Sequence, residues 1–144
     1  DIYDAYAAFN VTSAKYVLVE KAELWRASCY EHTFFKCCPS FAPELLDGFR
    51  RKIEEYIEPE IVRQGRACME KDHMYTFITG IFICEDTVQK EWKKQIKTFR
   101  FFKNYRFGIR GYSEARLLVF DMKNRKVMGN RAAGQLVKGY KKAF

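Results

Sequence analysis

The chain has 144 residues, of which 48% are hydrophobic and 17% are aromatic. This length is close to the commonest domain size, and this composition excludes a disordered chain. Charge is divided unevenly along the chain. Residues 1–88 contain 10 Lys/Arg and 15 Asp/Glu, whereas residues 89–144 contain 16 Lys/Arg and 3 Asp/Glu. The net charge of the whole chain is +8. The basic half is therefore expected to attract an anionic partner, either a nucleic acid or an acidic protein.

Hydropathy and cysteine content indicate the compartment. The longest apolar run, 77–84, is far shorter than the roughly 18 residues that a membrane span requires, so no membrane partner is expected. Five irregularly spaced cysteines, without a secretory signal, favour a reducing cytoplasm.

The first half of the chain predicts strands followed by a helix. The alanine-rich segment 3–9 is expected to be a short or frayed helix, and the β-formers of 15–36, with Leu18 and Trp25 among them, predict two or three short strands. From Pro43 onward the apolar residues have helical spacing, at Leu45, Leu46, Phe49, Ile53, Tyr56 and Ile57. Pro59 should end or kink this helix at Glu58.

The second half begins with a predicted strand at 74–84. Its odd-numbered and even-numbered residues are both largely apolar or small, which indicates a central strand in a sheet covered on both faces. Asp86 can cap a helix with Val88, Trp92, Ile96 and Phe99 on its inner side and Lys90, Lys93, Lys94 and Lys97 on its solvated side. A strand at 105–110 and a hairpin joining 116–122 to 126–128 should follow, and Asn130 can cap a closing helix.

The predicted order of elements is β-β-α-β-α-β-β-β-α. It lacks the regular alternation of a doubly wound fold and favours a single α+β domain over residues 1–144, with a mixed, mostly antiparallel sheet flanked by about three helices.

The strongest candidate for a binding region is the stretch 90–116, which interleaves nine Lys/Arg with seven aromatic residues. Phosphates attract dispersed cations and unstacked bases attract flat apolar faces, so this composition suits single-stranded nucleic acid. The competing interpretation places the aromatic residues in the core and the lysines in solvent. The candidate residues for anion binding are Lys93, Lys94, Lys97, Arg100, Arg106, Arg110, Tyr112 and Arg116.

Within that stretch, 110–116 crowds two arginines, a tyrosine, a serine and Glu114 around Gly111. Arginine forks bind carboxylate or phosphate, and a glycine lets backbone amides approach an anion. The alternative is an ion pair of Glu114 with Arg110 or Arg116 that braces a hairpin.

Four other residues form a candidate polar cluster: His32, His73, Glu114 and Asp121. Glu114 and Asp121, with Lys123, resemble the acidic pattern of Mg²⁺-dependent nucleases, although turn chemistry also explains Asp121; Glu85 and Asp86 are an alternative acidic pair. The two histidines are better explained as strand-edge polar residues than as general bases.

Cysteine and histidine spacing matches no standard zinc site, so the thiols are expected to be buried and no metal is expected. No phosphate-binding loop or dinucleotide fingerprint occurs, and we expect no cofactor.

Several stretches resemble a small family of uncharacterised proteins from Gram-positive bacteria: Glu31-His32 before Phe34-Phe35-Lys36, the segment from His73 to Glu85, Gly111 to Arg116, and Asn130 to Ala133. The resemblance covers most of the chain. It implies a bacterial, cytoplasmic, single-domain protein and carries no activity, so no catalytic residue follows from it.

Three hypotheses of function follow. The first is a non-enzymatic interaction domain whose basic half binds an anionic partner. The second is a metal-dependent hydrolase that uses Glu114 and Asp121. The third is self-association, in which the acidic half of one copy meets the basic half of another.

Overall fold

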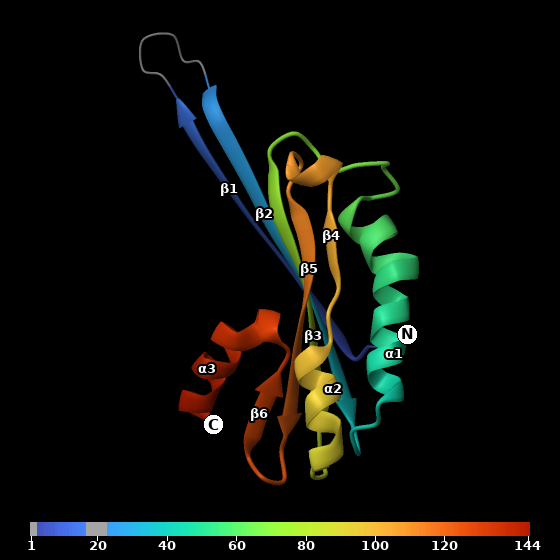
Figure 1. The fold of residues 1–144 in the computed structure, drawn as a ribbon. Helices are drawn as coiled ribbons and strands as arrows, with labels where there is room; N and C mark the ends of the chain where they lie inside the picture. Colours follow the sequence, from blue (N-terminus) through green and yellow to red (C-terminus); the bar gives the residue numbers. More distant parts are fainter. Residues whose placement is uncertain (1–2, 17–22) are drawn as a thin grey trace.

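The computed structural model describes residues 3–16 and 23–144 (Figure 1). Its six strands are β1 (Ala5–Tyr16), β2 (Glu23–Cys38), β3 (His73–Cys84), β4 (Phe102–Asn104), β5 (Tyr112–Asp121) and β6 (Lys126–Gly129). The helices are α1 (Glu44–Lys52), which continues as the π-helix η1 (Ile53–Val62), α2 (Lys93–Thr98) and α3 (Gly134–Ala143), with short 3₁₀ turns η2 (Lys90–Trp92), η3 (Arg106–Gly108) and η4 (Arg131–Ala133).

All six strands belong to one sheet, in the order β1-β2-β3-β5-β4, with β6 paired to β5. The middle three strands are parallel, and the outer pairs β1–β2, β4–β5 and β5–β6 are antiparallel. The helices α1 and α2 lie in the crossovers that parallel strands require. The predicted α+β class and the mixed sheet are confirmed.

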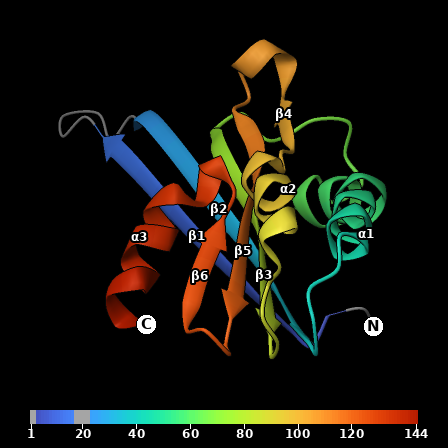
Figure 2. The same ribbon diagram turned by 60° about the horizontal axis from the view of Figure 1, so that its bottom comes forward.

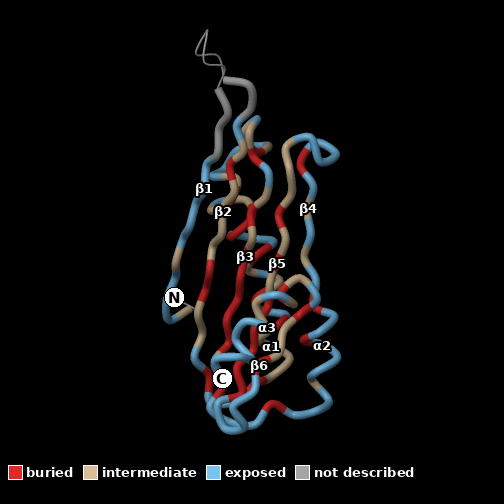
Figure 3. The backbone as a smooth tube through the Cα atoms, turned by 90° about the vertical axis from the view of Figure 1, so that its left-hand side faces the viewer, coloured by how far each residue is buried: buried red, intermediate tan, exposed pale blue. Residues whose placement is uncertain are grey.

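Each face of the sheet has its own core. On one face, α1, η1 and α2 pack over a large cluster that contains Phe49, Ile78, Ile96 and Leu117. A Cβ on Gly80 would lie 2.6 Å from the Phe49 ring, so this glycine lets α1 approach the central strand closely. On the other face, α3 covers only the half of the sheet around Leu118 and Phe120 (Figures 1 and 3).

Two predictions for the first half were wrong. Residues 3–9 belong to strand β1, because pairing with β2 along its whole length outweighs the weak helical preference of alanine. The predicted group of short strands at 15–36 is instead the end of β1 and one 16-residue strand, β2. Leu18 lies outside the described residues.

The helix predicted from Pro43 does not end at Glu58. It runs past Pro59 to Val62 because its backbone widens to π geometry, in which the amide of Arg63 donates to the carbonyl of Glu58. Tyr56, predicted to face inward, is exposed.

In the second half, the central strand, the β5–β6 hairpin and the closing helix are confirmed. Asp86 caps no helix, since the amide of Val88 bonds to the Asp121 carboxylate and η2 begins without a side-chain cap. The strand predicted at 105–110 was wrong: these residues contain the turn η3, and the strand that pairs with the start of β5 is the short β4. None of the helices in the described residues has the length and apolar composition needed to cross a membrane.

Asn130 joins three elements at the end of β6. Its buried side-chain amide donates to the carbonyls of Phe99 (3.1 Å) and Ala115 (3.0 Å). Its oxygen accepts from the amides of Leu117 (2.9 Å) and Ala133 (3.1 Å), so the predicted cap is confirmed and extended to β5 and to the end of α2.

We expect Asn130→Asp to lower the free energy of unfolding by about 3 kcal/mol, because a carboxylate would face two carbonyl oxygens to which it cannot donate. Urea denaturation at neutral pH measures this loss. The exposed Asn104 provides the control, since Asn104→Asp should change stability by less than about 0.5 kcal/mol. Equal losses in the two variants would contradict the role assigned to Asn130.

Candidate anion-binding groove

A groove of about 710 Å³ lies along the free edge of β6, between α2 and α3. Figure 2 shows β6 between the two helices, and both helices pack on this strand. Gly129 allows the approach of α3, because a Cβ there would lie 2.9 Å from Val137 and would also collide with the carbonyl of Leu117. The groove is therefore built by the β5–β6 hairpin and the two helices, and Asn130 is among its lining residues.

The groove is lined by cationic and apolar side chains. Seven basic side chains line it: Lys93 and Lys97 of α2, Arg125 and Lys126 of the hairpin, Arg131 of η4, and Lys138 and Lys141 of α3. The apolar lining comes from Ile96, Val127, Met128, Val137 and Phe144. No Asp or Glu occurs among the described residues that line the groove, so its cations attract an anion without an internal competitor.

A second hollow of about 270 Å³ continues from the groove, with which it shares Lys97, Asn130 and Arg131. Its lining adds Arg100 and also one carboxylate, that of Glu114 on the open face of the sheet. A basic path thus leads from the groove toward the half of the sheet that α3 leaves uncovered.

Aromatic rings lie at the end of this path. The guanidinium of Arg100 is 5.8 Å from the centre of the Phe102 ring, and that ring stacks on Tyr112 at 5.4 Å. Tyr112 also contacts Tyr75 and Phe77 on β3. Phe102 is 41% exposed, so the cluster offers a flat apolar surface to solvent.

The structure brings together only some of the predicted anion-binding residues. Lys93 and Lys97 line the groove. Arg100 lines the second hollow, and Tyr112 belongs to the ring cluster beyond it. Lys94 is exposed on α2 and does not line the groove. Arg106 and Arg110 lie in the turn before β5, which is at the other end of this strand from the β5–β6 hairpin. Arg116 packs over the Phe77 ring (3.2 Å) and contacts Glu31 (3.9 Å).

Five basic residues of the groove were missed: Arg125, Lys126, Arg131, Lys138 and Lys141. The uneven charge of the sequence indicated cations in this region, but only the packing of α3 beside β6 shows which of them face α2. The predicted ion pair of Glu114 with Arg110 or Arg116 does not occur in the described structure.

The candidate polar cluster of His32, His73, Glu114 and Asp121 does not form. Glu114 and Asp121 lie seven positions apart on β5, about 23 Å along the strand and on opposite faces, so they cannot share a metal ion. Burial favours the neutral form of Asp121, but hydrogen bonds from Asn124 and from the Val88 amide outweigh burial and lower the pKa of Asp121. The carboxylate of Asp121 therefore accepts hydrogen bonds in the turn between β5 and β6.

The histidines are also accounted for by local contacts. The Tyr6 hydroxyl forms a hydrogen bond with Nδ1 of His32 (2.6 Å), and burial lowers the pKa of this histidine. Nδ1 of His73 lies 2.6 Å from the carbonyl of Arg110, which can only accept, and its Nε2 lies 2.8 Å from the Thr76 hydroxyl.

Among the described residues, no group of three or more Cys, His, Asp or Glu side chains could hold a metal ion. The thiols of Cys38 and Cys84 are buried 3.1 Å apart at paired positions of β2 and β3. Their burial raises the pKa of both thiols, which makes them poor nucleophiles and poor metal ligands.

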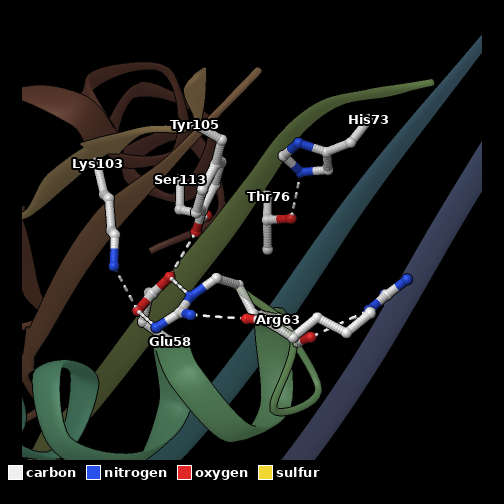
Figure 4. Close-up of polar contacts among 8 residues, drawn as sticks. Glu58, Arg63, His73, Thr76, Lys103, Tyr105 and Ser113 are labelled. Atoms are coloured by element: carbon white, nitrogen blue, oxygen red, sulfur yellow. Dashed lines mark hydrogen bonds and ion pairs between the residues drawn. The ribbon is translucent and has the colours of Figure 1, made fainter. Parts of the chain in front are cut away.

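A second polar cluster surrounds Glu58 on the opposite face of the sheet from α3 (Figure 4). Its carboxylate, only 3% exposed, accepts from Nε of Arg63 (2.6 Å), Nζ of Lys103 (2.9 Å) and the hydroxyl of Tyr105 (2.9 Å). The Tyr105 hydroxyl also contacts Ser113 (2.8 Å). The contacts of this cluster hold η1 against β4 and β5.

Glu58 should make stability depend on acid pH. Burial favours its neutral form, but the bonds from Arg63, Lys103 and Tyr105 outweigh burial and lower its pKa below the ordinary 4.5. Its contribution is therefore complete above pH 4.5 and is lost as the pH falls through the lowered pKa. We expect Glu58→Gln to be less stable than the wild type at neutral pH, by about 3 kcal/mol, and this gap to narrow in acid.

Urea denaturation of both proteins from neutral to acid pH tests this expectation. Glu54→Gln is the matched control, because Glu54 is exposed on the same helix. A gap of constant size for Glu58→Gln at every pH would contradict it.

Comparison with known proteins assigns a family and no activity. No curated protein and no solved structure matches the chain. One family model matches residues 1–142, nearly the whole length. The chain therefore belongs to the family described as domain of unknown function DUF8052.

Proposed function

We propose that the protein binds single-stranded nucleic acid, with the phosphates in the groove between α2 and α3. The observation that carries this proposal is the composition of the groove, which has seven cations and no carboxylate among its described lining residues. A strand whose phosphates replace condensed counterions on such a surface binds with an affinity that falls steeply with salt.

The aromatic path favours nucleic acid over an acidic protein. Acidic side chains would use the cations alone, whereas unstacked bases also use flat rings. The rings of Phe102 and Tyr112 lie beyond Arg100, where a strand leaving the groove along the basic path would meet them. A duplex keeps its bases stacked inside and gains nothing from these rings, so the structure supports a single strand.

Charge reversal in the groove tests the first part of the proposal. We expect Lys97→Glu/Lys138→Glu to weaken binding of a fluorescent oligothymidylate by about tenfold or more at low salt, and to reduce the slope of log affinity against log salt. The control is Arg51→Glu/Lys71→Glu, which changes net charge equally at exposed positions away from the groove. Fluorescence anisotropy measures both. Equal losses in the two variants, or no binding by the wild type at low salt, would refute the proposal.

Truncation of a ring tests the second part. We expect Phe102→Ala to weaken oligothymidylate binding about fivefold or more, because one stacked base contributes about 1–3 kcal/mol, and to leave the binding of inorganic polyphosphate unchanged. Phe107→Ala is the control, since Phe107 is fully exposed in η3 and belongs to no ring cluster. If Phe102→Ala weakened both ligands equally, or neither, the stacking role would be wrong.

A further inference from the structure

The outer edge of β1 is an open strand edge without the usual protection. β1 is the last strand on its side of the sheet, and in the described structure it pairs only with β2. Its residues from Ala5 to Ala14 include no charged residue, proline or glycine, and its register with β2 is regular as far as Lys15. Natural sheets interrupt such edges because an unpaired row of backbone groups recruits another strand.

Both faces of this strand are open to solvent as well. Phe9 and Val11, on one face, are each 63% exposed, and Tyr6, on the other, is 50% exposed. Figure 3 shows exposed or half-buried backbone along the described part of β1 from Ala5 to Thr12. Tyr6 lines a hollow with Lys52 of α1 and Tyr56 of η1, while Phe9 and Val11 present apolar groups beside the free backbone edge of β1.

The other edge of the same sheet is protected. It consists of β4 and β6, which are three and four residues long, and each contains a lysine, Lys103 and Lys126. Short, charged strands are a common means of preventing edge pairing. The contrast indicates that the edge of β1 is kept free for pairing.

We propose that β1 pairs antiparallel with β1 of a second copy of this chain across a two-fold axis. A two-fold axis perpendicular to the sheet sets a residue opposite itself, and with Asn10 at the axis, Phe9 of each copy lies opposite Val11 of the other. Aromatic and β-branched residues are favourable cross-strand partners. Symmetry forms this pair twice, on the face where both side chains are exposed.

Charge favours the antiparallel direction. Asp4, just before β1, and Lys15, near its end, are the only charged residues between positions 4 and 16. Parallel pairing in register would set Asp4 beside Asp4 and Lys15 beside Lys15, whereas antiparallel pairing about Asn10 keeps like charges apart. Two copies of a chain with a net charge of +8 repel each other, and an edge without charge from Ala5 to Ala14 is where they can meet with little repulsion.

Sedimentation velocity of the full chain at several concentrations tests the proposal. We expect a concentration-dependent species of twice 17.1 kDa that persists in high salt, because the contact is made by backbone and apolar groups. Phe9→Lys/Val11→Lys should raise the dissociation constant about tenfold or more, since four lysines would meet across the axis. Ile109→Lys/Met122→Lys is the control with equal charge at two other exposed apolar positions, and it should dimerise like the wild type.

A monomeric wild type at every concentration would overturn the proposal. Loss of the dimer in high salt would also overturn it, and would favour a contact between the acidic and basic halves of two copies. Equal weakening of dimerisation in Phe9→Lys/Val11→Lys and in Ile109→Lys/Met122→Lys would also overturn the proposal.

A cysteine crosslink keeps the proposal testable if the lysine variant does not fold. In a Cys37→Ser background, which removes the exposed native thiol, Asn10→Cys should form a disulfide between two copies faster than Asn104→Cys. Equal rates would overturn the assigned axis.

Discussion

The groove depends on the buried side chain of Asn130. Its four hydrogen bonds hold the end of α2, strand β5 and the start of α3 in one arrangement. An asparagine can do this because its amide donates and accepts at the same site, which neither an aspartate nor a leucine can do. With α2 and α3 fixed on either side of β6, lysines from segments about forty residues apart face a common space.

Most elements from α1 onward could be predicted from the sequence because they follow from local patterns. In β3 the residues pointing to either face are apolar, which indicates a strand covered on both faces. Ile96 and Phe99 have the spacing of residues on one side of a helix. β1 could not be predicted in this way. Its alanines favour a helix locally, and only the long pairing with β2, in which Ala5 lies opposite Phe35, makes it a strand.

The site was harder to predict than the fold, for a physical reason. The sequence shows that Lys93 and Lys97 lie on the solvated side of α2. The pattern of one helix cannot show whether this side faces open solvent or a groove lined by other cations. Lys138 and Lys141 complete the groove only because α3 packs beside β6, where Gly129 leaves room for it. For Glu114 and Asp121 the difficulty was separation, since two residues close in sequence lie far apart once the strand is extended.

The two proposed functions use opposite edges of the sheet and do not interfere with each other. The groove lies at the edge of β6, and β1 is separated from it by β2, β3 and β5. Pairing through β1 would therefore leave both grooves open, at opposite ends of one continuous sheet. A nucleic-acid strand held in one groove would then raise its own effective concentration at the other, provided that it is long enough to span the joined sheets. Dimerisation would in this way strengthen binding without adding any contact to either groove.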